Sequence, residues 1–515
     1  MPRSRRKPSR SAPRCGRWRR TCRRAPSSTG AWQTGHGWHT ERMRRVLPGP
    51  ASPAWVAAET LGSAVTALVG LLFVARIIGP QAAGTGAIAA SVFLTVDFPI
   101  AALFGDSLLQ RRGLEERHRS SALWATMGAA AVGMLVLWLG APLIARATGA
   151  PVTGMIRAMA LLLPFSAAAG MLSALVLKER RYRLLASRVL LCQPLAVGTG
   201  VLAALGGAGA WSMAAQQAAA TLSVFLLLAL RSGWRPQRLF QRAALAELWP
   251  VAGPQILALL VFNGRYRIFI VGLGMLVAET VVAVTHIAFR LLDVAMAVVT
   301  GAASRLAMPR LAALQNDRAA LAEAYGDLAQ LQALIGLPIA AGLAITAPRL
   351  IEILMGGPWI GAAEPARLVA LAAIPGFLVG PAPALWLALG RTRMNLLMQL
   401  VAFTLPLVGL LVLRPQDAAA AAICWVLGSL AVPPLQLLVT LRALHRSPAW
   451  LAQRLLAPLL GTLVMGVVSA WAARELAAQA AVPALIGTAL AGAIAYAAVV
   501  APALGFRWPR ALQEA

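Results

Sequence analysis

The stretch LLVFNGRYRIFIVGL, residues 259–273, decides the fold because it places Arg265 and Arg267 inside a long aliphatic run. An arginine at the centre of a membrane helix costs about 2.5–3.5 kcal/mol, so the pair costs about 5–7 kcal/mol. The eleven Ile, Leu, Val and Phe residues of 256–273 offset this by about 0.3–0.6 kcal/mol each. Such a helix favours arginines that meet water or an anion inside a bundle, or that extend to the membrane interface.

The composition of the whole chain is that of a membrane protein. Hydrophobic residues make up 59% of the 515 residues, and charged residues make up 13%. The mean hydropathy is +0.71. A soluble domain carries roughly a quarter charged residues and does not need apolar runs of membrane-spanning length. The sequence therefore predicts an all-α, polytopic membrane protein.

About fourteen apolar runs approach the roughly 20 residues that a membrane span requires. Their approximate limits are 54–78, 84–108, 121–145, 154–177, 185–205, 208–230, 250–273, 277–301, 328–348, 366–389, 394–413, 418–441, 454–473 and 482–504. The longest link, about 302–327, is either an amphipathic helix or, as we favour, an extension of the next span. No link is long enough for a separate catalytic domain, so we do not expect an enzyme.

The net charge of +29 is distributed as in a membrane protein, not as in a nucleic-acid-binding stripe. Lysines and arginines gather in alternate links, at 111–119, 178–183, 231–242, 305–318, 391–393 and 442–454. The intervening link 206–210 has none. The positive-inside rule then predicts that the basic links and both termini are cytoplasmic, and no nucleic-acid partner is expected.

The first 45 residues differ from the rest of the chain. They contain 14 of the 47 Lys and Arg residues and a single acidic residue, Glu41. This composition predicts a basic disordered tail at 1–45, which could contact anionic lipids. Alternatively, translation begins at Met43, and the tail is not part of the protein.

The four cysteines indicate neither a disulfide framework nor a metal site. Cys192 and Cys424 lie in apolar runs. The other two lie in the tail near two histidines, but the spacing of this set fits zinc poorly (Cys15, Cys22, His36 and His39). We therefore expect no metal and no cofactor.

Six stretches of the chain carry a family resemblance. They are ARIIGPQAAGTGAIA (75–89), LKERRYRLLASR (177–188), GAWSMAAQQAAATLSVFLLLALRSGWRP (209–236), IAFRLLDVAM (287–296), GGPWIGAAEPARLVALAAIP (356–375) and ALGRTR (388–393). In this order and spacing, they resemble the bacterial polysaccharide (lipid-linked oligosaccharide) flippases of the MOP superfamily, which also contains lipid II flippases and multidrug-and-toxin-extrusion pumps. A weak internal repeat, 76–92 against 271–288, fits the repeated halves of many transporters.

The resemblance implies a fold and a function. The fold is two six-helix lobes around a cavity, at about 53–242 and 243–445, followed by a helix pair at 450–505. The function is export of an undecaprenyl-diphosphate-linked oligosaccharide (an O-antigen, capsule or exopolysaccharide repeat unit) from the inner to the outer leaflet of the bacterial cytoplasmic (inner) membrane. Expected partners are this lipid-linked oligosaccharide, membrane lipids, and polysaccharide polymerase or assembly proteins.

Candidate substrate-binding residues follow from the chemistry of such a cargo. A diphosphate requires fixed cations, which makes Arg265 and Arg267 candidates for binding it. These two side chains are about 200° apart on a helix, and Asn263 shares the face of Arg267. The resemblance adds Arg76, in RIIGP, as a cation of the first lobe. It also adds Gln217, in GAWSMAAQQ, whose amide could bond a sugar hydroxyl or a neighbouring helix.

Three further charged residues lie inside predicted spans. Asp97 is near the middle of its span and could bind a coupling ion or pair with an arginine across the cavity. Arg290 and Asp293 are three residues apart and can pair on one helix face, which favours a structural role over ion coupling. Many relatives carry an acidic residue near Arg267, and this departure weakens any inherited cation coupling at that position.

Three other functions are consistent with parts of the sequence. A cation-coupled multidrug antiporter of the same superfamily would favour acidic groups in its cavity, whereas the intramembrane charges here lean to arginine. A membrane glycosyltransferase or polymerase would need a sizeable external loop or an Asp-rich nucleotide-sugar domain. A non-transporting scaffold would leave the costly intramembrane charges unexplained. The flippase is the favoured hypothesis, and the antiporter is the main alternative.

Overall fold

The computed structural model describes residues 53–505 of the chain. The predicted tail at 1–45 and the alternative start at Met43 lie outside the described residues. Within 53–505, every regular element is a helix and no strand is found, as the composition predicts. The described residues all fall within one compact unit by their internal contacts.

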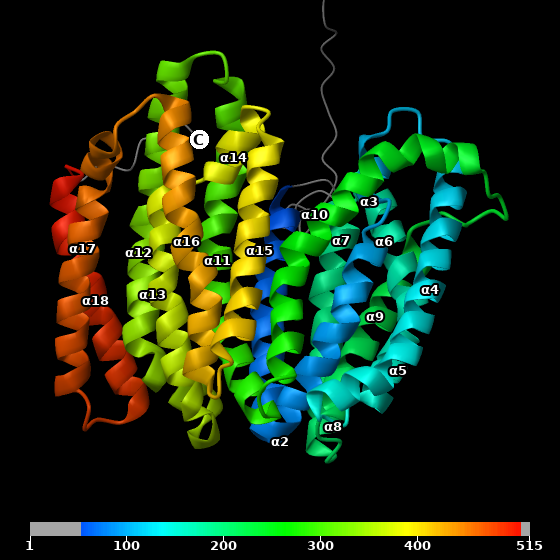
Figure 1. Cartoon of the computed structure of the whole chain (residues 1–515), viewed down its shortest axis with the longest axis horizontal. Helices are drawn as coiled ribbons and strands as arrows, with labels where there is room; N and C mark the ends of the chain where they lie inside the picture. Colours follow the sequence, from blue (N-terminus) through cyan, green and yellow to red (C-terminus); the bar gives the residue numbers. More distant parts are fainter. Residues whose placement is uncertain (1–52, 506–515) are drawn as a thin grey trace, which may run out of the picture. The chain divides into compact units, whose positions relative to one another are not determined.

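The helices run mostly along one common direction (Figure 1). In chain order they are α2 (Pro53–Ala101), α3 (Gly105–Gln110), α4 (Glu116–Thr148), α5 (Thr153–Ala160), α6 (Leu163–Lys178), α7 (Tyr182–Ser187), the π-helix η1 (Arg188–Cys192), α8 (Gln193–Leu205), α9 (Trp211–Arg231), α10 (Arg242–Gly274), α11 (Glu279–Ala313), α12 (Arg318–Met355), the 3₁₀-helix η2 (Gly357–Ala362), α13 (Ala363–Val379), α14 (Ala382–Ala388), α15 (Thr392–Leu413), α16 (Ala418–Leu444), α17 (Pro448–Glu475) and α18 (Ala481–Ala503).

Helix α2 is interrupted at Gly79, whose φ of 78° and ψ of 170° are not helical. A φ in this region is favourable for glycine and costly for other residues. The next residue, Pro80, has no amide hydrogen to donate to the preceding turn. α2 therefore consists of two arms, 53–78 and 80–101, which correspond to the first two predicted spans.

Eleven described helices are long and apolar enough to cross a membrane, or twelve if the bent pair α5–α6 is counted as one span. The prediction of a polytopic all-α membrane protein is therefore confirmed. The count of fourteen stays a prediction, because it requires both arms of α2, and also α11, to cross the bilayer.

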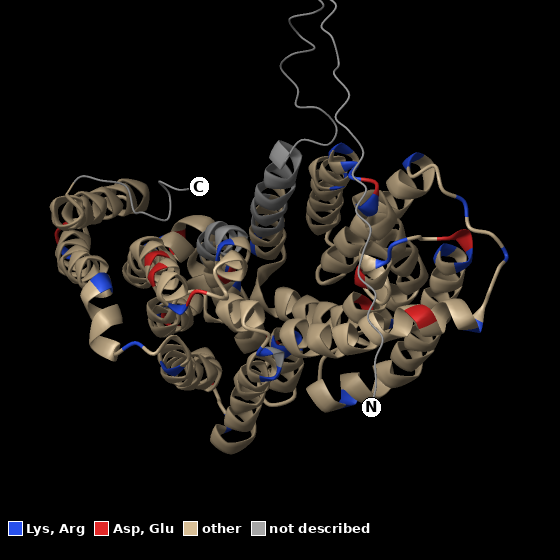
Figure 2. Ribbon diagram, turned by 90° about the horizontal axis from the view of Figure 1, so that it is seen from above, with Lys and Arg blue, Asp and Glu red and all other residues tan. Residues whose placement is uncertain are grey.

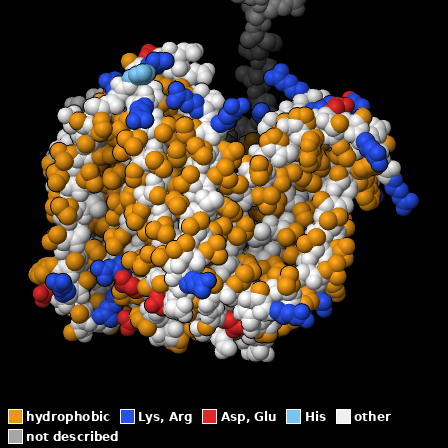
Figure 3. All heavy atoms as spheres, viewed as in Figure 1, with side chains coloured by type: hydrophobic (Ala, Val, Ile, Leu, Met, Phe, Trp, Pro, Cys, Tyr) orange, Lys and Arg blue, Asp and Glu red, His pale blue; other side chains and the backbone are white. Residues whose placement is uncertain are grey.

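The surface of the bundle is apolar over its middle. Figure 3 shows hydrophobic side chains across the broad centre of one face, with most charged side chains toward its upper and lower margins. Leu139, Leu202 and Leu411 are 69%, 71% and 72% exposed. Water-soluble proteins rarely expose apolar area on this scale, so this surface is suited to contact with lipid.

Charged residues lie mainly in the links and at the helix ends (Figure 2). Three of the basic links meet at one end of the bundle. There, Lys178 Nζ donates to the carbonyl of Arg111 at 2.6 Å, and Arg181 donates to the carbonyl of Ser232 at 2.8 Å. We call this the basic end, and we call the opposite end, where α2 breaks at Gly79, the far end.

At the far end, α2 makes close contacts with α11 and α12. A Cβ atom on Gly84 would overlap the carbonyl of Glu279 in the first turn of α11, so a larger residue does not fit there. The Arg76 guanidinium donates to the carbonyls of Ile353 and Leu354, at 3.2 and 3.3 Å, in the last turn of α12. A cation is favourable at this position because the final carbonyls of a helix lack amide partners.

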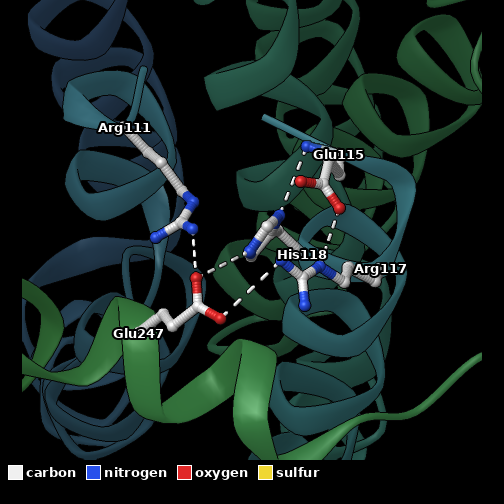
Figure 4. Close-up of polar contacts among 5 residues, drawn as sticks. All are labelled: Arg111, Glu115, Arg117, His118 and Glu247. Carbon is white, nitrogen blue, oxygen red and sulfur yellow. Dashed lines mark hydrogen bonds and ion pairs between the residues drawn. The ribbon is translucent and has the colours of Figure 1, made fainter. Parts of the chain in front are cut away.

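At the basic end, Glu247 anchors the first turns of α10 to α3 and α4 (Figure 4). Its carboxylate pairs with Arg111 and lies 3.8 Å from Nη2 of Arg117. Nε2 of the buried His118 is 3.3 Å from the same carboxylate, and Nδ1 of His118 accepts from the amide of Glu115 at 3.2 Å. Because Nδ1 accepts, the proton on Nε2 faces Glu247.

The predicted link 302–327 lies within α11 and α12 apart from a short turn, so it mainly extends the two spans. The 38 residues of α12 correspond to a length of about 57 Å, almost twice a hydrocarbon core of about 30 Å. The final pair α17–α18 packs along this helix. Arg454 Nη1 donates to Asp327 Oδ1 at 2.9 Å, and Tyr496 Oη donates to the carbonyl of Leu334 at 2.7 Å.

Candidate functional site

A cavity of about 470 Å³ lies among α2, α8, α9, α10 and α11. Helices α2, α8 and α9 fall in the first predicted lobe, and α10 and α11 fall in the second. The cavity is lined by Leu71, Val74, Ala75, Ala90, Ser91, Leu94, Gln193, Ala196, Met213, Gln216, Gln217, Ala220, Tyr266, Arg267, His286, Arg290, Asp293 and Val294. Two guanidinium groups and three side-chain amides therefore meet in a space enclosed by apolar helices.

Helical spacing explains how α9 and α11 present these polar groups. Gln217, a predicted site residue, lies on the lining face of α9, and its Nε2 donates to Thr221 Oγ1 at 3.2 Å. On α11, His286, Arg290 and Asp293 are separated by four and three residues, which places them on one helix face. The two faces point into the same cavity from the two predicted lobes.

Arg290 and Asp293 form the ion pair that their spacing allows. Arg290 Nη1 lies 3.5 Å from Asp293 Oδ2, and the two side chains are 42% and 56% exposed. The Arg290 guanidinium also lies 5.7 Å from the centroid of the Tyr266 ring. An ion pair this exposed contributes little to stability, so its groups stay available to a ligand.

Arg267 bridges the two predicted lobes. Its Nη1 donates to the backbone carbonyl of Asn263 at 2.9 Å, and its guanidinium lies 5.5 Å from the Phe98 ring centroid on the second arm of α2. Asn263 thus contributes a backbone oxygen that orients Arg267, while the side chain of Arg267 lines the cavity.

Arg265 lies apart from Arg267, on another side of α10. Its guanidinium stacks 4.7 Å from the centroid of the Trp425 ring on α16. Asp293 lies close enough to attract it electrostatically. Arg265 is therefore next to the cavity, behind the residues that line it.

The remaining two predicted site residues also lie outside the lining. Asp97 is only 8% exposed, and its Oδ1 has no hydrogen-bond partner. Ser166 interacts with its carboxylate by hydrogen bonding, and Arg267 attracts the carboxylate electrostatically. Arg76, on α2, lies at the far end, where its guanidinium contacts the last turn of α12. The structure thus gathers Arg267, Gln217, Arg290 and Asp293 in one cavity, with Asp97 beside them.

Sequence reasoning missed an aromatic group next to the cavity. Tyr266 Oη lies 2.5 Å from Nδ1 of His286, and the Tyr266, Phe289 and Trp425 ring centroids lie within 6.0 Å of one another. His286 could have been found, because it is four residues before Arg290 on the same helix face. The contact with Trp425 has no local signal in the sequence.

The chemistry of this cavity is that of a binding site. Guanidinium groups bind phosphate or carboxylate through paired N–H donors, and amides bond hydroxyl groups. Across the described residues 53–505, no group of three or more His, Cys, Asp or Glu side chains is placed to hold a metal ion. The site suits a ligand with an anionic part and a polar, neutral part.

The fold defines the class of the protein. An inward closed structure of the lipid II flippase MurJ matches 88% of this chain and 99% of its own chain, with a TM-score of 0.68 and 13% identity. An inward-facing multidrug resistance MATE family transporter matches 75% of this chain and 96% of its own, with a TM-score of 0.60 and 14% identity. The chain therefore has the fold of the MOP superfamily of membrane transporters.

The sequence profile of the family described as polysaccharide biosynthesis protein matches residues 73–364, more than half of the chain. The chain belongs to this family. It is 19% identical over 291 residues to the teichuronic acid biosynthesis protein TuaB of Bacillus subtilis (strain 168), covering 56% of this chain and 60% of TuaB. It is 24% identical over 322 residues to the succinoglycan biosynthesis transport protein ExoT of Rhizobium meliloti (strain 1021), covering 62% of this chain and 64% of ExoT. The matches thus span slightly less than two thirds of each relative.

Proposed function

We propose that this protein is a flippase that moves an undecaprenyl-diphosphate-linked oligosaccharide from the inner to the outer leaflet of the bacterial cytoplasmic membrane. The observation that carries the proposal is the cavity that Arg267 and Arg290 line together with Gln216 and Gln217. The family description, polysaccharide biosynthesis protein, supports the same class of cargo, as do the names of TuaB (teichuronic acid biosynthesis) and ExoT (succinoglycan biosynthesis transport).

Different residues of the cavity would bind different parts of the cargo. The diphosphate would bind Arg267 and Arg290, because guanidinium groups stay charged and bind phosphate oxygens in pairs. The first sugars would bond the glutamines of α9. The polyprenyl chain would remain in the bilayer, so the protein needs no catalytic step, only alternate exposure of the cavity to the two sides.

The far end would be the periplasmic end, with the basic links and both termini in the cytoplasm. In that orientation, the contacts of Arg76 with α12 and of Gly84 with Glu279 would close the cavity toward the periplasm. Arg76 would then act by holding the closed arrangement. Polysaccharide polymerase or assembly proteins would take over the cargo on the outer side.

The test is a pair of variants at the cavity. Arg267→Ala should reduce surface polysaccharide about tenfold or more, since a hydrogen bond to a charged group contributes about 1.5–3 kcal/mol. Arg267→Lys should retain more export, because charge is the first requirement. Lipid-linked oligosaccharide should accumulate in the inner leaflet of the alanine variant while its membrane level stays normal.

The exposed Arg367, which lies 4.0 Å from Glu364 outside the cavity, supplies the control Arg367→Ala, which should export normally. Normal export by Arg267→Ala would contradict the proposal. If deletion of the gene leaves surface polysaccharide unchanged but sensitises cells to cationic drugs, the protein is instead the cation-coupled multidrug antiporter.

A further inference from the structure

A second pocket of about 470 Å³ lies at the basic end, away from the central cavity. It lies between the α7–η1 segment and the end of α9, and it is lined by Arg181, Arg183, Leu184, Ser187, Leu191, Leu227 and Arg231. Three of its seven lining residues are therefore arginines, and three are leucines. The stretch LKERRYRLLASR, which the proposed function leaves without a role, forms most of this pocket.

Arg181 is held in place by the end of α9. Its Nη2 donates to the carbonyl of Arg231 at 2.7 Å, and its Nη1 donates to the carbonyl of Ser232 at 2.8 Å. The preceding residue, Arg180, has a φ of 55°, an uncommon conformation for a residue with a side chain. The unfavourable backbone conformation of Arg180 thus directs Arg181 toward the carbonyls at the end of α9.

The pocket has an excess of positive charge. Within residues 53–505, Arg181 has one acidic neighbour, Glu179 at 3.4 Å, and neither Arg183 nor Arg231 takes part in an ion pair. Both of these side chains are exposed. Three guanidinium groups around one pocket repel one another unless an anion lies between them, so the pocket is suited to a ligand of negative charge.

The other wall of the pocket is apolar and continues onto the lipid-facing surface. Leu191 is 63% exposed, and its neighbours Leu190, Leu226 and Leu230 are 43%, 57% and 72% exposed. A free inorganic anion gains nothing from leucines. A molecule with an anionic head and a hydrocarbon chain would use both walls.

We propose that this pocket binds the phosphate head of a lipid in the leaflet at the basic end. Basic pockets between helices on the cytoplasmic side bind anionic lipid head groups, and arginine matches phosphate oxygens in pairs. Two lipids share this chemistry: an anionic phospholipid of the bilayer and a polyprenyl phosphate. The site is separate from the cavity of the proposed function and does not require that function to be correct.

The pocket and the central cavity lie along the same face of α9. Gln217, Ala220, Leu227 and Arg231 are separated by three, seven and four residues and therefore share one face of the helix. Gln217 and Ala220 line the central cavity, and Leu227 and Arg231 line the basic pocket. The two sites are about 10 Å apart along the axis, from Ala220 to Leu227.

The experiment measures lipid binding to the purified full chain by native mass spectrometry. The probes are phosphatidylglycerol, undecaprenyl phosphate and, as a neutral lipid, phosphatidylcholine. The variant Arg183→Gln/Arg231→Gln removes two exposed side chains that form no ion pair among residues 53–505. Each arginine near an anionic lipid contributes about 1 kcal/mol, and about 1.4 kcal/mol changes Kd tenfold. The double variant should therefore bind the preferred probe about thirtyfold more weakly.

The matched control is Arg235→Gln/Arg238→Gln, which removes the same charge from the exposed link outside the pocket. It should bind as the unmodified chain does. Weaker binding of phosphatidylglycerol alone identifies a bilayer lipid, and weaker binding of undecaprenyl phosphate alone identifies the polyprenyl carrier. Equal binding by the pocket variant and the unmodified chain overturns the proposal, and so does an equal loss in the control.

Discussion

At the scale of single residues, the two arginines of α10 have different surroundings although they are two positions apart. Arg267 lines the cavity, whereas Arg265 stacks on Trp425 behind it. A cation that lies on an aromatic face gains about 0.5–2 kcal/mol, with the larger values in desolvated sites. Arg265 is therefore stabilised inside the bundle by its contact with α16, whereas the side chain of Arg267 faces the cavity.

This arrangement predicts an energetic coupling between Arg265 and Trp425. In a double-mutant cycle with Arg265→Leu and Trp425→Leu, the free energies of unfolding should show a coupling of about 0.5–2 kcal/mol. Denaturant titration of the purified protein in detergent measures it. The control cycle combines Arg146→Leu with Trp425→Leu. Among the described residues the Arg146 guanidinium, on α4, does not stack on the Trp425 ring as that of Arg265 does, so this cycle should give no coupling. Additive effects in the first cycle would show that the stacking contributes nothing.

The sequence predicts the directions of these side chains better than their partners. Helix geometry alone places Arg265 and Arg267 on different sides of α10. The same geometry would have placed His286 on one helix face with Arg290 and Asp293. It cannot supply contacts between distant parts of the chain. The partners of Arg76 lie 277 and 278 residues further along, and no local pattern indicates them.

At the scale of helices, the far end depends on one glycine. Gly84 lets the second arm of α2 contact the backbone of α11 at Glu279. Any side chain at this position must push the two helices apart, because backbone atoms cannot turn aside as a flexible side chain can.

We therefore predict that Gly84→Leu prevents closure of the far end. The variant should reach the membrane but lose most export, and an added Gln217→Cys should react faster with a membrane-impermeant thiol reagent in intact cells. Gly128→Leu is the control, because a Cβ atom at Gly128 meets no atom within 4 Å. Unchanged export and unchanged labelling in Gly84→Leu would show that the far end stays open during transport or closes elsewhere.

The sequence indicates where the helices lie more readily than where they are irregular. Hydrophobic runs and basic links locate most spans, and Gly79 with Pro80 marks the turn within α2. The π-helix Arg188–Cys192 is not among the elements that the sequence predicts. The sequence could not predict the shape of either pocket, because that shape depends on the distances between several helices, and local sequence patterns do not give those distances.

At the scale of the whole molecule, the orientation in the membrane is the main expectation to test. Single cysteines are introduced as Arg238→Cys and Ala208→Cys in a chain without Cys15 and Cys22. The native Cys192 and Cys424 are buried and should not react.

By the positive-inside rule, an impermeant thiol reagent should label Ala208→Cys in intact cells. It should label Arg238→Cys only after the membrane is permeabilised. The reverse pattern would place the basic end in the periplasm, and the lipid of the basic pocket would then come from the outer leaflet.

The fixed charges around the central cavity also respond to the membrane voltage. Arg265, Arg267 and Arg290 outnumber Asp97 and Asp293 by one positive charge. A unit charge that crosses a potential of 100 mV changes in free energy by about 2.3 kcal/mol. When the two orientations of the protein place these charges at different depths of the electric field, the voltage shifts their populations. A diphosphate bound there, as proposed, would reverse the sign of the total charge, so the same voltage would drive the loaded and empty forms in opposite directions.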